Sequence, residues 1–220
     1  MQARRLFSFV GRRPIILESS VSLSITPLQQ DPKLRTYTHK TTPFTQLLTL
    51  EGPVGKAEFK LVDGLSLTQV PSKYPQTTTY SLALDSERFS SLRKAQQIFV
   101  QRMWGCSSTL LSNAATGVNE GFYAIVRLVG VGYKASLSED KTTLLLKVGF
   151  SHIVQVPVPK EILQVEILGP GTKISLFGID KQKLMLFAHS LRSIRKPNVY
   201  SGKGIYVDDE QVKLKAKSKK

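Results

Sequence analysis

The feature that most constrains the fold is a pattern of apolar residues that occurs twice in the chain. A shift of 97 residues pairs 46–52 with 143–149. In each copy the next segment alternates apolar side chains with others, as a strand with one buried face does: Ala57, Phe59 and Leu61 in the first copy, and Val154, Val156 and Val158 in the second. The middle of the chain is therefore predicted to hold two copies of one strand-rich unit.

Each set of strands is followed by a segment with the spacing of a helix. A shift of 95 residues pairs Asp85 with Asp180, and either aspartate can accept hydrogen bonds from the first free amides of a helix. The buried face of each helix is predicted from positions three or four residues apart: Phe89, Leu92, Gln96, Phe99 and Met103 in the first copy, and Leu184, Phe187, Leu191 and Ile194 in the second. Both aspartates are therefore assigned a structural role.

The predicted fold class is α+β, with two duplicated small domains that each pack an antiparallel-rich β-sheet against one main α-helix. The first domain is placed at 40–117 and the second at 118–207, because Gly117 can end the first long helix. Residues 1–39 are interpreted as a basic leader and linker, and residues 208–220 as a Lys-rich tail.

The net charge is concentrated at the two ends of the chain. The 220 residues include 31 Lys and Arg against 16 Asp and Glu, which gives a formal charge of +15. Residues 1–17 carry +4 and residues 192–220 carry +6, so the other 174 residues carry only +5. Because Lys and Arg displace condensed counterions from a phosphate backbone, this clustering predicts a polyanionic partner rather than charge that serves solubility alone.

The first segment has the composition of an organellar targeting sequence. Four arginines stand among apolar residues, no acid precedes Glu18, and serines follow. Such a start is typical of a mitochondrial transit peptide, although plastid leaders overlap in composition. A basic RNA-binding arm on the mature protein is the alternative. At the other end, the segment from Lys213 onward is predicted to be a solvated tail that orders only on a partner.

The sequence predicts no catalytic, cofactor or metal site. Cys106 is the single cysteine, and the three histidines lie more than thirty residues apart with no ligand-type residue at metal spacing. The glycines of 130–135 match a dinucleotide-binding fingerprint, but a hairpin turning at Glu139 and Asp140 is predicted where that fingerprint needs a helix. No apolar run approaches the ~20 residues that a membrane-spanning helix requires.

The candidate binding site is the basic segment 191–205. Pro197 ends the preceding helix, and Gly202 and Gly204 leave out side chains on both sides of Lys203, so that the backbone can approach a phosphate. Tyr200 offers a ring on which a base can stack. An ordinary basic helix end followed by a loop is the alternative. The predicted RNA-binding residues are Arg192, Arg195, Lys196, Tyr200, Gly202, Lys203, Gly204, Lys213, Lys215 and Lys217.

Five ordered blocks of the second half resemble the large-subunit ribosomal protein L6 family in its mitochondrial form: 117–122, 128–135, 149–152, 178–182 and 197–205. The first half matches weakly, through 52–55 and the long helix. The resemblance implies two duplicated α+β domains with no enzymatic activity, no small-molecule substrate and no cofactor. It also implies a structural role in mitochondrial translation, in the matrix. The second domain would dock on large-subunit rRNA near the region that faces translation factors, beside neighbouring large-subunit proteins. The leader, taken to be absent from bacterial members, agrees with import.

The resemblance also assigns residues. Tyr200, Gly202, Lys203 and Gly204 match the terminal rRNA-binding signature of the family, whereas Ser201 stands where the family usually has Lys and Tyr206 where a basic residue is common. Either the Lys-rich tail supplies the missing cations, or the contact is weaker and depends on neighbouring proteins. The acids at 208–210 receive no role. The alternative function is a non-ribosomal organellar module that binds RNA or DNA with the same fold.

Overall fold

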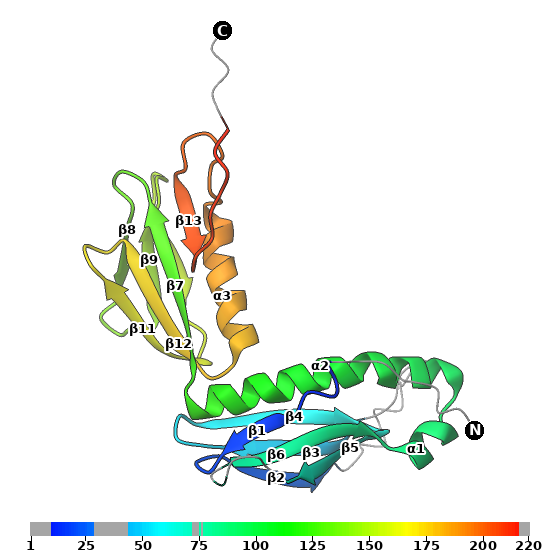
Figure 1. Ribbon diagram of the computed structural model, residues 1–220. Helices are drawn as coiled ribbons and strands as arrows, with labels where there is room; N and C mark the ends of the chain where they lie inside the picture. The colour runs from blue at the N-terminus through cyan, green and yellow to red at the C-terminus, as the bar shows by residue number, and fades with distance from the viewer. Residues whose placement is uncertain (1–9, 29–43, 72–74, 76, 216–220) are drawn as a thin grey trace. The chain divides into compact units, whose positions relative to one another are not determined.

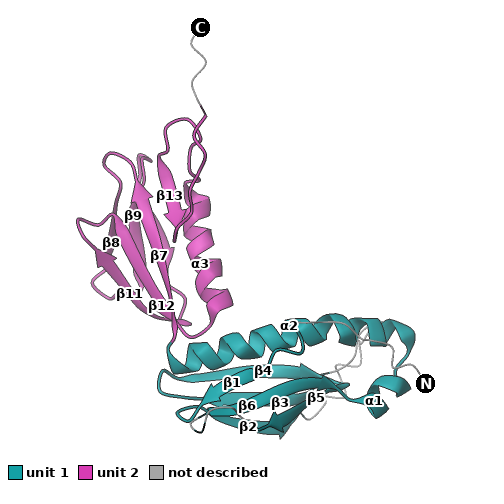
Figure 2. Cartoon of the chain, in the orientation of Figure 1, with its two compact units in different colours: residues 1–120 teal, residues 121–220 magenta. Residues whose placement is uncertain are grey.

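The computed structural model describes residues 10–28, 44–71, 75 and 77–215. The chain divides into two compact units, Met1–Glu120 and Gly121–Lys220, which Figure 2 shows in different colours. The division lies three residues beyond the predicted one. The reason is that the helix does not end at Gly117: it continues to Asn119, and Glu120 forms its C-cap.

The first unit contains two three-stranded antiparallel sheets, in the orders β1-β6-β5 and β2-β3-β4 (Figure 1). Every pairing is antiparallel, as predicted for this fold class. The strands are β1 (Ile15–Glu18), β2 (Ser22–Pro27), β3 (Phe44–Glu51), β4 (Lys56–Val62), β5 (Leu65–Val70) and β6 (Thr77–Leu84).

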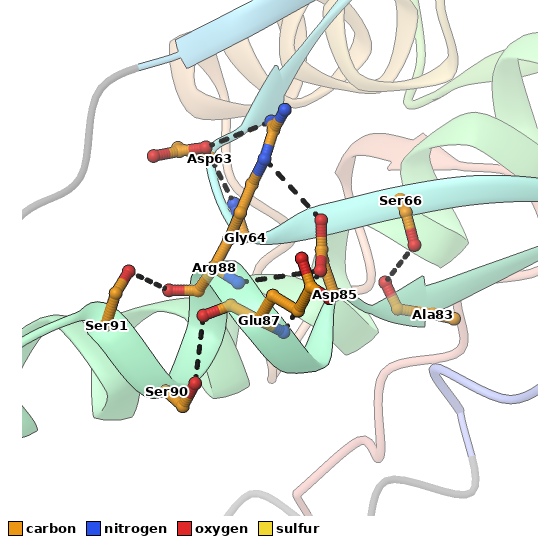
Figure 3. Close-up of polar contacts among 9 residues, drawn as sticks. All are labelled: Asp63, Gly64, Ser66, Ala83, Asp85, Glu87, Arg88, Ser90 and Ser91. Carbon is orange, nitrogen blue, oxygen red and sulfur yellow. Dashed lines mark hydrogen bonds and ion pairs between the residues drawn. The ribbon is translucent and has the colours of Figure 1, made fainter.

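The helical part of the first unit begins at Asp85, as predicted. The Asp85 carboxylate accepts hydrogen bonds from the amides of Glu87 and Arg88 at the start of α1 (Ser86–Ser91). The Arg88 guanidinium in turn reaches the carboxylates of Asp85 and Asp63, both at 3.5 Å (Figure 3). These contacts fix the beginning of the helix to the turn between β4 and β5.

One helix was predicted in this segment, but the structure has two. Leu92 and Arg93 adopt extended backbone angles between α1 and α2 (Lys94–Asn119). The side-chain amide of Gln97 donates to the backbone carbonyls of Phe89 and Leu92, at 3.1 and 3.0 Å. The side-chain carbonyl of Gln96 accepts from the backbone amide of Arg93. Side chains at the start of α2 therefore satisfy backbone groups that a continuous helix would have paired internally.

The second unit contains one three-stranded and one four-stranded antiparallel sheet, in the orders β10-β9-β8 and β11-β12-β7-β13, with a single helix. Its elements are β7 (Phe122–Val129), β8 (Lys134–Leu137), β9 (Thr143–Lys147), β10 (Val154–Pro157), β11 (Ile162–Leu168), β12 (Lys173–Gly178), α3 (Lys181–Ile194) and β13 (Gly204–Val207). The predicted hairpin after residue 130 is confirmed as β8 and β9, so no helix follows the glycines of 130–135.

The two units share one topology, which confirms the predicted duplication of the fold. The orders β1-β6-β5 and β2-β3-β4 recur as β7-β12-β11 and β8-β9-β10, and a helix follows the sixth strand of each set. The strand β13, which pairs with the free side of β7, is the addition in the second unit. The predicted start of the first unit, residue 40, was too late, because β1 and β2 lie within the stretch interpreted as leader and pair with β6 and β3.

The core of the second unit holds the candidate site in place. The buried residues of β7 alternate along the strand, and α3 packs its stripe Leu184, Phe187 and Leu191 against the same cluster. The predicted cap is confirmed: the Asp180 carboxylate accepts from the amides of Gln182 and Lys183. Burying three large side chains of this kind stabilises the helix on the sheet by several kcal/mol, at about 1.5–3 kcal/mol each.

Candidate nucleic-acid interface

The candidate site is built on the turn that joins α3 to β13. Arg195 leaves the helical conformation, with φ −140° and ψ 85°, and Pro197 follows. The Arg195 carbonyl then accepts a hydrogen bond from the Ile205 amide at 2.9 Å. Residues 195–204, here called the basic loop, therefore leave the end of the helix and return to it. Figure 1 shows β13 beside α3.

Hydrogen bonds inside the basic loop fix its shape. The Asn198 amide donates to the Lys203 carbonyl at 2.9 Å, and the Gly202 amide donates to the Asn198 carbonyl at 2.8 Å. The Asn198 side chain accepts from the Tyr200 amide at 2.8 Å. Gly202 has φ +68°, a conformation that costs a residue with a β-carbon. The loop is therefore rigid even though most of it lies at the surface.

The two glycines of the loop have different roles. A β-carbon on Gly204 would lie 2.5 Å from the Cα atom of Pro197, and Gly204 is buried. The absence of a side chain at Gly204 thus allows the loop to close on itself. The interpretation from the sequence, that it lets a phosphate approach the backbone, is corrected here because Gly204 is buried. Gly202 has more room and is half-buried, with its carbonyl accepting from the Tyr206 hydroxyl at 2.7 Å. The buried Tyr206 side chain therefore holds Gly202, and with it the loop, in place.

Three of the predicted cations line one surface hollow. Arg195, Lys196 and Lys203 are exposed there, and no carboxylate lines it. We call this the cationic hollow, and its full lining is Tyr133, Ile194, Arg195, Lys196, Asn198, Ser201 and Lys203. The fold therefore gathers three of the cations around one hollow. A cluster of positive side chains without neighbouring acids favours an anionic ligand.

Tyr133 is a lining residue to which the sequence interpretation gave no role. Tyr133 is only 8% exposed, and its ring lies between two glycines: β-carbons on Gly130 and Gly149 would fall 3.0 and 3.2 Å from it. The signal in the sequence was Gly130, which lies in the segment 130–135 that matches a nucleotide fingerprint and belongs to the block 128–135 of the family resemblance. Gly130 and Gly149, but not Gly132, thus make room for a tyrosine that forms part of the hollow.

An aromatic stack borders the hollow. The guanidinium carbon of Arg195 lies 5.1 Å from the centre of the Phe150 ring, and that ring stacks on His152 with centroids 5.7 Å apart and planes 17° apart. A cation over an aromatic face is attracted to it, so this contact orients Arg195 without neutralising its charge.

Arg192 is placed differently from the other predicted cations. Its guanidinium makes a bidentate ion pair with the Glu210 carboxylate, with Nε 2.7 Å from Oε2, and it does not line the hollow. The hydrogen bond from Arg192 lowers the pKa of Glu210, and the same bond raises the pKa of Arg192. Arg192 therefore holds the chain after β13 in place.

The acids that follow β13 fold the chain back onto the sheet. The Asp208 carboxylate accepts from the Ile125 amide at 2.8 Å, and Asp208 itself has φ +47°. Arg127 donates to the backbone carbonyls of Asp208 and Glu210, at 2.7 and 3.3 Å. Asp208 and Glu210 thus have structural roles that the sequence analysis could not assign.

The beginning of the Lys-rich tail lies along the basic loop. The Lys215 amide donates to the Val199 carbonyl at 2.9 Å, and the side chains of Lys213 and Lys215 are exposed. Tyr200, on the same loop, is 55% exposed. The tail up to residue 215 is therefore attached to the protein, not free as predicted. Lys217 lies outside the described residues.

Two other kinds of site are absent from the described part of the chain. No group of three or more His, Cys, Asp or Glu residues there could hold a metal ion. Within the same residues, no helix is both long enough and apolar enough to cross a membrane.

Comparison with known proteins places these features in a family. The family model of ribosomal protein L6 matches residues 129–208, which include β8 to β13 and the basic loop. A large ribosomal subunit protein uL6m of Neurospora crassa is 31% identical over 98% of this chain and 84% of its own length. The chain belongs to the ribosomal protein L6 family. Its members are structural proteins of the ribosome, and the chain is accordingly not an enzyme.

Bacterial relatives are as similar as the mitochondrial one. Large ribosomal subunit proteins uL6 of Mycoplasmoides gallisepticum and Fervidobacterium nodosum are each 32% identical, over 95% and 94% of this chain and 95% and 97% of their own lengths. Both alignments extend over nearly the whole chain, so the likeness to bacterial proteins is not confined to the second unit.

Proposed function

We propose that the protein is a structural constituent of the large ribosomal subunit that binds large-subunit rRNA through the cationic hollow and the basic loop. The observation that carries this proposal is the convergence of Arg195, Lys196 and Lys203 on one hollow that no carboxylate lines. The membership of the L6 family, together with the names of its relatives, supports the ribosome as the place where this surface acts.

The chemistry of the surface suits a phosphate backbone. Lys213 and Lys215, attached beside the loop, extend the three cations of the hollow to five. Side chains cannot enter the deep major groove of A-form RNA, so recognition uses phosphates, 2′-hydroxyls and the shape of the helix. The exposed ring of Tyr200 adds a surface on which an unpaired base stacks.

The rigidity of the loop makes binding more favourable. A flexible basic loop would lose conformational freedom when it engaged RNA, and this loss would oppose association. Here Asn198, Gly202 and Tyr206 already hold the loop in one shape through backbone and side-chain hydrogen bonds. The cations therefore reach the phosphates without an ordering step in the loop backbone.

The proposed location is the large subunit of the mitochondrial ribosome, on the side that faces translation factors. The support for a mitochondrial location is the Neurospora crassa relative, whose match covers 98% of the chain, together with the Arg-rich first segment. Because bacterial relatives are equally similar, fractionation of the source cell distinguishes a mitochondrial ribosome from another one. Residues 1–9, with Arg4 and Arg5, lie outside the described residues, and a targeting role for them is part of this proposal.

The decisive experiment is sedimentation of an organelle lysate through a density gradient, with detection of this chain. The expected result is co-migration with the large subunit. The variant Lys203→Glu reverses one charge in the hollow and is expected to lower incorporation by about tenfold, because each lost phosphate contact weakens binding. Lys160→Glu, an exposed lysine of the same unit outside the hollow, is the matched control.

Two outcomes contradict the proposal. The protein in free or DNA-bound fractions of the gradient supports the non-ribosomal alternative. Equal incorporation of Lys203→Glu and wild type refutes the assignment of the hollow. A further check is the dependence on salt: five engaged cations imply that the affinity for isolated rRNA falls by roughly 10²–10³ between 50 and 200 mM salt.

A further inference from the structure

The outer face of the sheet β10-β9-β8 carries a pair of lysines that the fold places directly opposite each other. In the register of β8 and β9, Lys134 pairs with Lys147, and both side chains are exposed. The next pair, Ala135 and Leu146, is buried in the core, so the two lysines point to the outer face together. Opposite residues of antiparallel strands have β-carbons about 4.5–5.5 Å apart, and like charges in this position destabilise the sheet.

No described ion pair and no acidic side chain at the outward strand positions compensates the two charges. The described ion pairs of the second unit are Lys183 with Glu161 and Arg192 with Glu210, and neither involves Lys134 or Lys147. The remaining outward positions of the three strands bear no carboxylate: Ser136, Thr143, Leu145, Gln155 and Pro157. The sheet thus keeps an unfavourable pair of charges on a face without a counter-ion of its own.

The position of Lys134 is further restrained by the turn between β11 and β12. The Ala135 amide donates to the Gly171 carbonyl at 2.7 Å, and a β-carbon on Gly171 would lie 2.8 Å from Cγ of Lys134. Gly171 is buried and has φ +88°. The aliphatic part of Lys134 therefore runs alongside this turn, which limits its freedom to turn away from Lys147.

We infer that Lys134 and Lys147, which are not among the residues that line the cationic hollow, form a second RNA-binding surface that takes phosphate groups of large-subunit rRNA. The inference rests on the proposed function and extends it to a face for which the sequence predicted no RNA contact. A phosphate between the two ammonium groups removes their repulsion and leaves the sheet more stable than in the free protein. The exposed hydroxyl of Ser136 and the amide of Gln155 are further donors for phosphate or 2′-hydroxyl oxygens.

RNA fits this face better than a protein does. Lysine is depleted at protein–protein interfaces, whereas phosphate contacts in nucleic-acid complexes come from Lys, Arg, Ser and Gln side chains. The face also lacks an exposed aromatic anchor of the kind that dominates protein interfaces. An acidic neighbouring protein is therefore the competing occupant that the experiment has to distinguish.

The test uses the full chain and an in vitro transcript of the large-subunit rRNA from the same organism. The double variant Lys134→Gln/Lys147→Gln keeps the length of both side chains and removes both charges. Loss of two phosphate contacts is expected to reduce the slope of log affinity against log salt by about 1.5, and to weaken binding roughly tenfold or more at 100 mM salt. Lys134→Arg/Lys147→Arg keeps both charges and should bind like wild type, as should Lys160→Gln.

A second readout separates this site from a general effect of positive charge. In the free protein at low salt, Lys147→Gln alone should raise the unfolding temperature of the second unit by roughly 1–3 °C, because it removes the opposed charge. The gain should disappear in 0.5 M salt, where the charges are screened. Lys147→Arg should give no gain. The prediction is therefore a variant that is more stable alone yet binds rRNA less well.

The outcomes distinguish this inference from the proposed function. If the double Gln variant binds like wild type while Lys203→Glu binds weakly, the second surface is refuted and the hollow stands. If the double variant binds rRNA normally but is not incorporated into the large subunit, the face contacts a protein and the inference is wrong. If wild type shows no preference for large-subunit rRNA, the proposed function fails together with it.

Discussion

Removing the Glu210 carboxylate should release the chain after β13 and destabilise the second unit. In the structure the Arg192 guanidinium donates two hydrogen bonds to this carboxylate, and the side chains are 30% and 26% exposed. Charge-assisted hydrogen bonds contribute about 1.5–3 kcal/mol each when buried, and exposed ion pairs contribute about 0–1 kcal/mol. For a pair with this intermediate exposure we expect Glu210→Gln to lower the free energy of unfolding by about 1 kcal/mol.

The assay is thermal unfolding of the full chain, followed on the transition of the second unit. For a unit of about 100 residues, 1 kcal/mol corresponds to a fall of roughly 4–8 °C in the unfolding temperature at neutral pH. Glu139→Gln is the matched control, because Glu139 is exposed in the turn between β8 and β9 and has no ion-pair partner among the described residues. It should shift the transition by less than half as much.

The effect should also depend on pH. Because Arg192 lowers the pKa of Glu210 in the folded protein, the unfolded chain binds the proton more readily, and the carboxylate contributes stability above its unfolded pKa of about 4.3. That contribution is lost as the pH falls through the lower, folded pKa. The difference between wild type and Glu210→Gln should therefore be largest above about pH 5 and decline in acid. Equal unfolding temperatures at pH 7, or a difference that does not decline in acid, would refute this account of the ion pair.

Two further substitutions test the construction of the basic loop. Gly204→Ala should destabilise the second unit by about 2 kcal/mol or more, because its β-carbon would lie 2.5 Å from the Pro197 backbone and its φ is +154°; denaturant unfolding measures this, and a neutral result would show that the loop has room. Tyr206→Phe should cost about 1 kcal/mol by leaving the Gly202 carbonyl without its 2.7 Å hydrogen bond. It should also weaken rRNA binding although it changes no charge, and unchanged affinity would contradict the importance of a rigid loop.

The repeat in the sequence predicted most of the fold, but not where it begins. Strands β3, β4, β9 and β10 lie where the two copies were aligned. The strand β2 was missed because its residues are mostly exposed and give no apolar alternation, and because an Arg-rich, Ser-rich stretch is typical of a targeting segment. The duplication could have predicted the two missing strands. In the second unit β7 and β8 precede β9, so the first unit needs two corresponding strands before β3.

The charged residues of the candidate site could be predicted from the sequence, but the contacts that hold them in place could not. A helix end rich in cations, followed by Pro197, was enough to bring Arg195, Lys196 and Lys203 together. The role of Asp208 depends on Ile125, 83 residues earlier in the chain, and no local pattern reveals such a contact. A sequence also cannot distinguish a glycine that admits a ligand from one that admits the protein's own backbone, which is the case for Gly204.

The added strand β13 makes the length of the basic loop as important as its composition. All four residues of β13 are buried: Ile205 and Val207 join the core, while Gly204 and Tyr206 alternate with them toward the opposite side. Because side chains alternate along a strand, one residue inserted or deleted between Pro197 and Lys203 would either stretch the loop or turn Ile205 and Val207 out of the core. The number of residues between the end of α3 and the start of β13 is therefore fixed by the packing of β13 against β7. Substitutions at the exposed positions of the basic loop should be tolerated by the fold, whereas insertions and deletions should not.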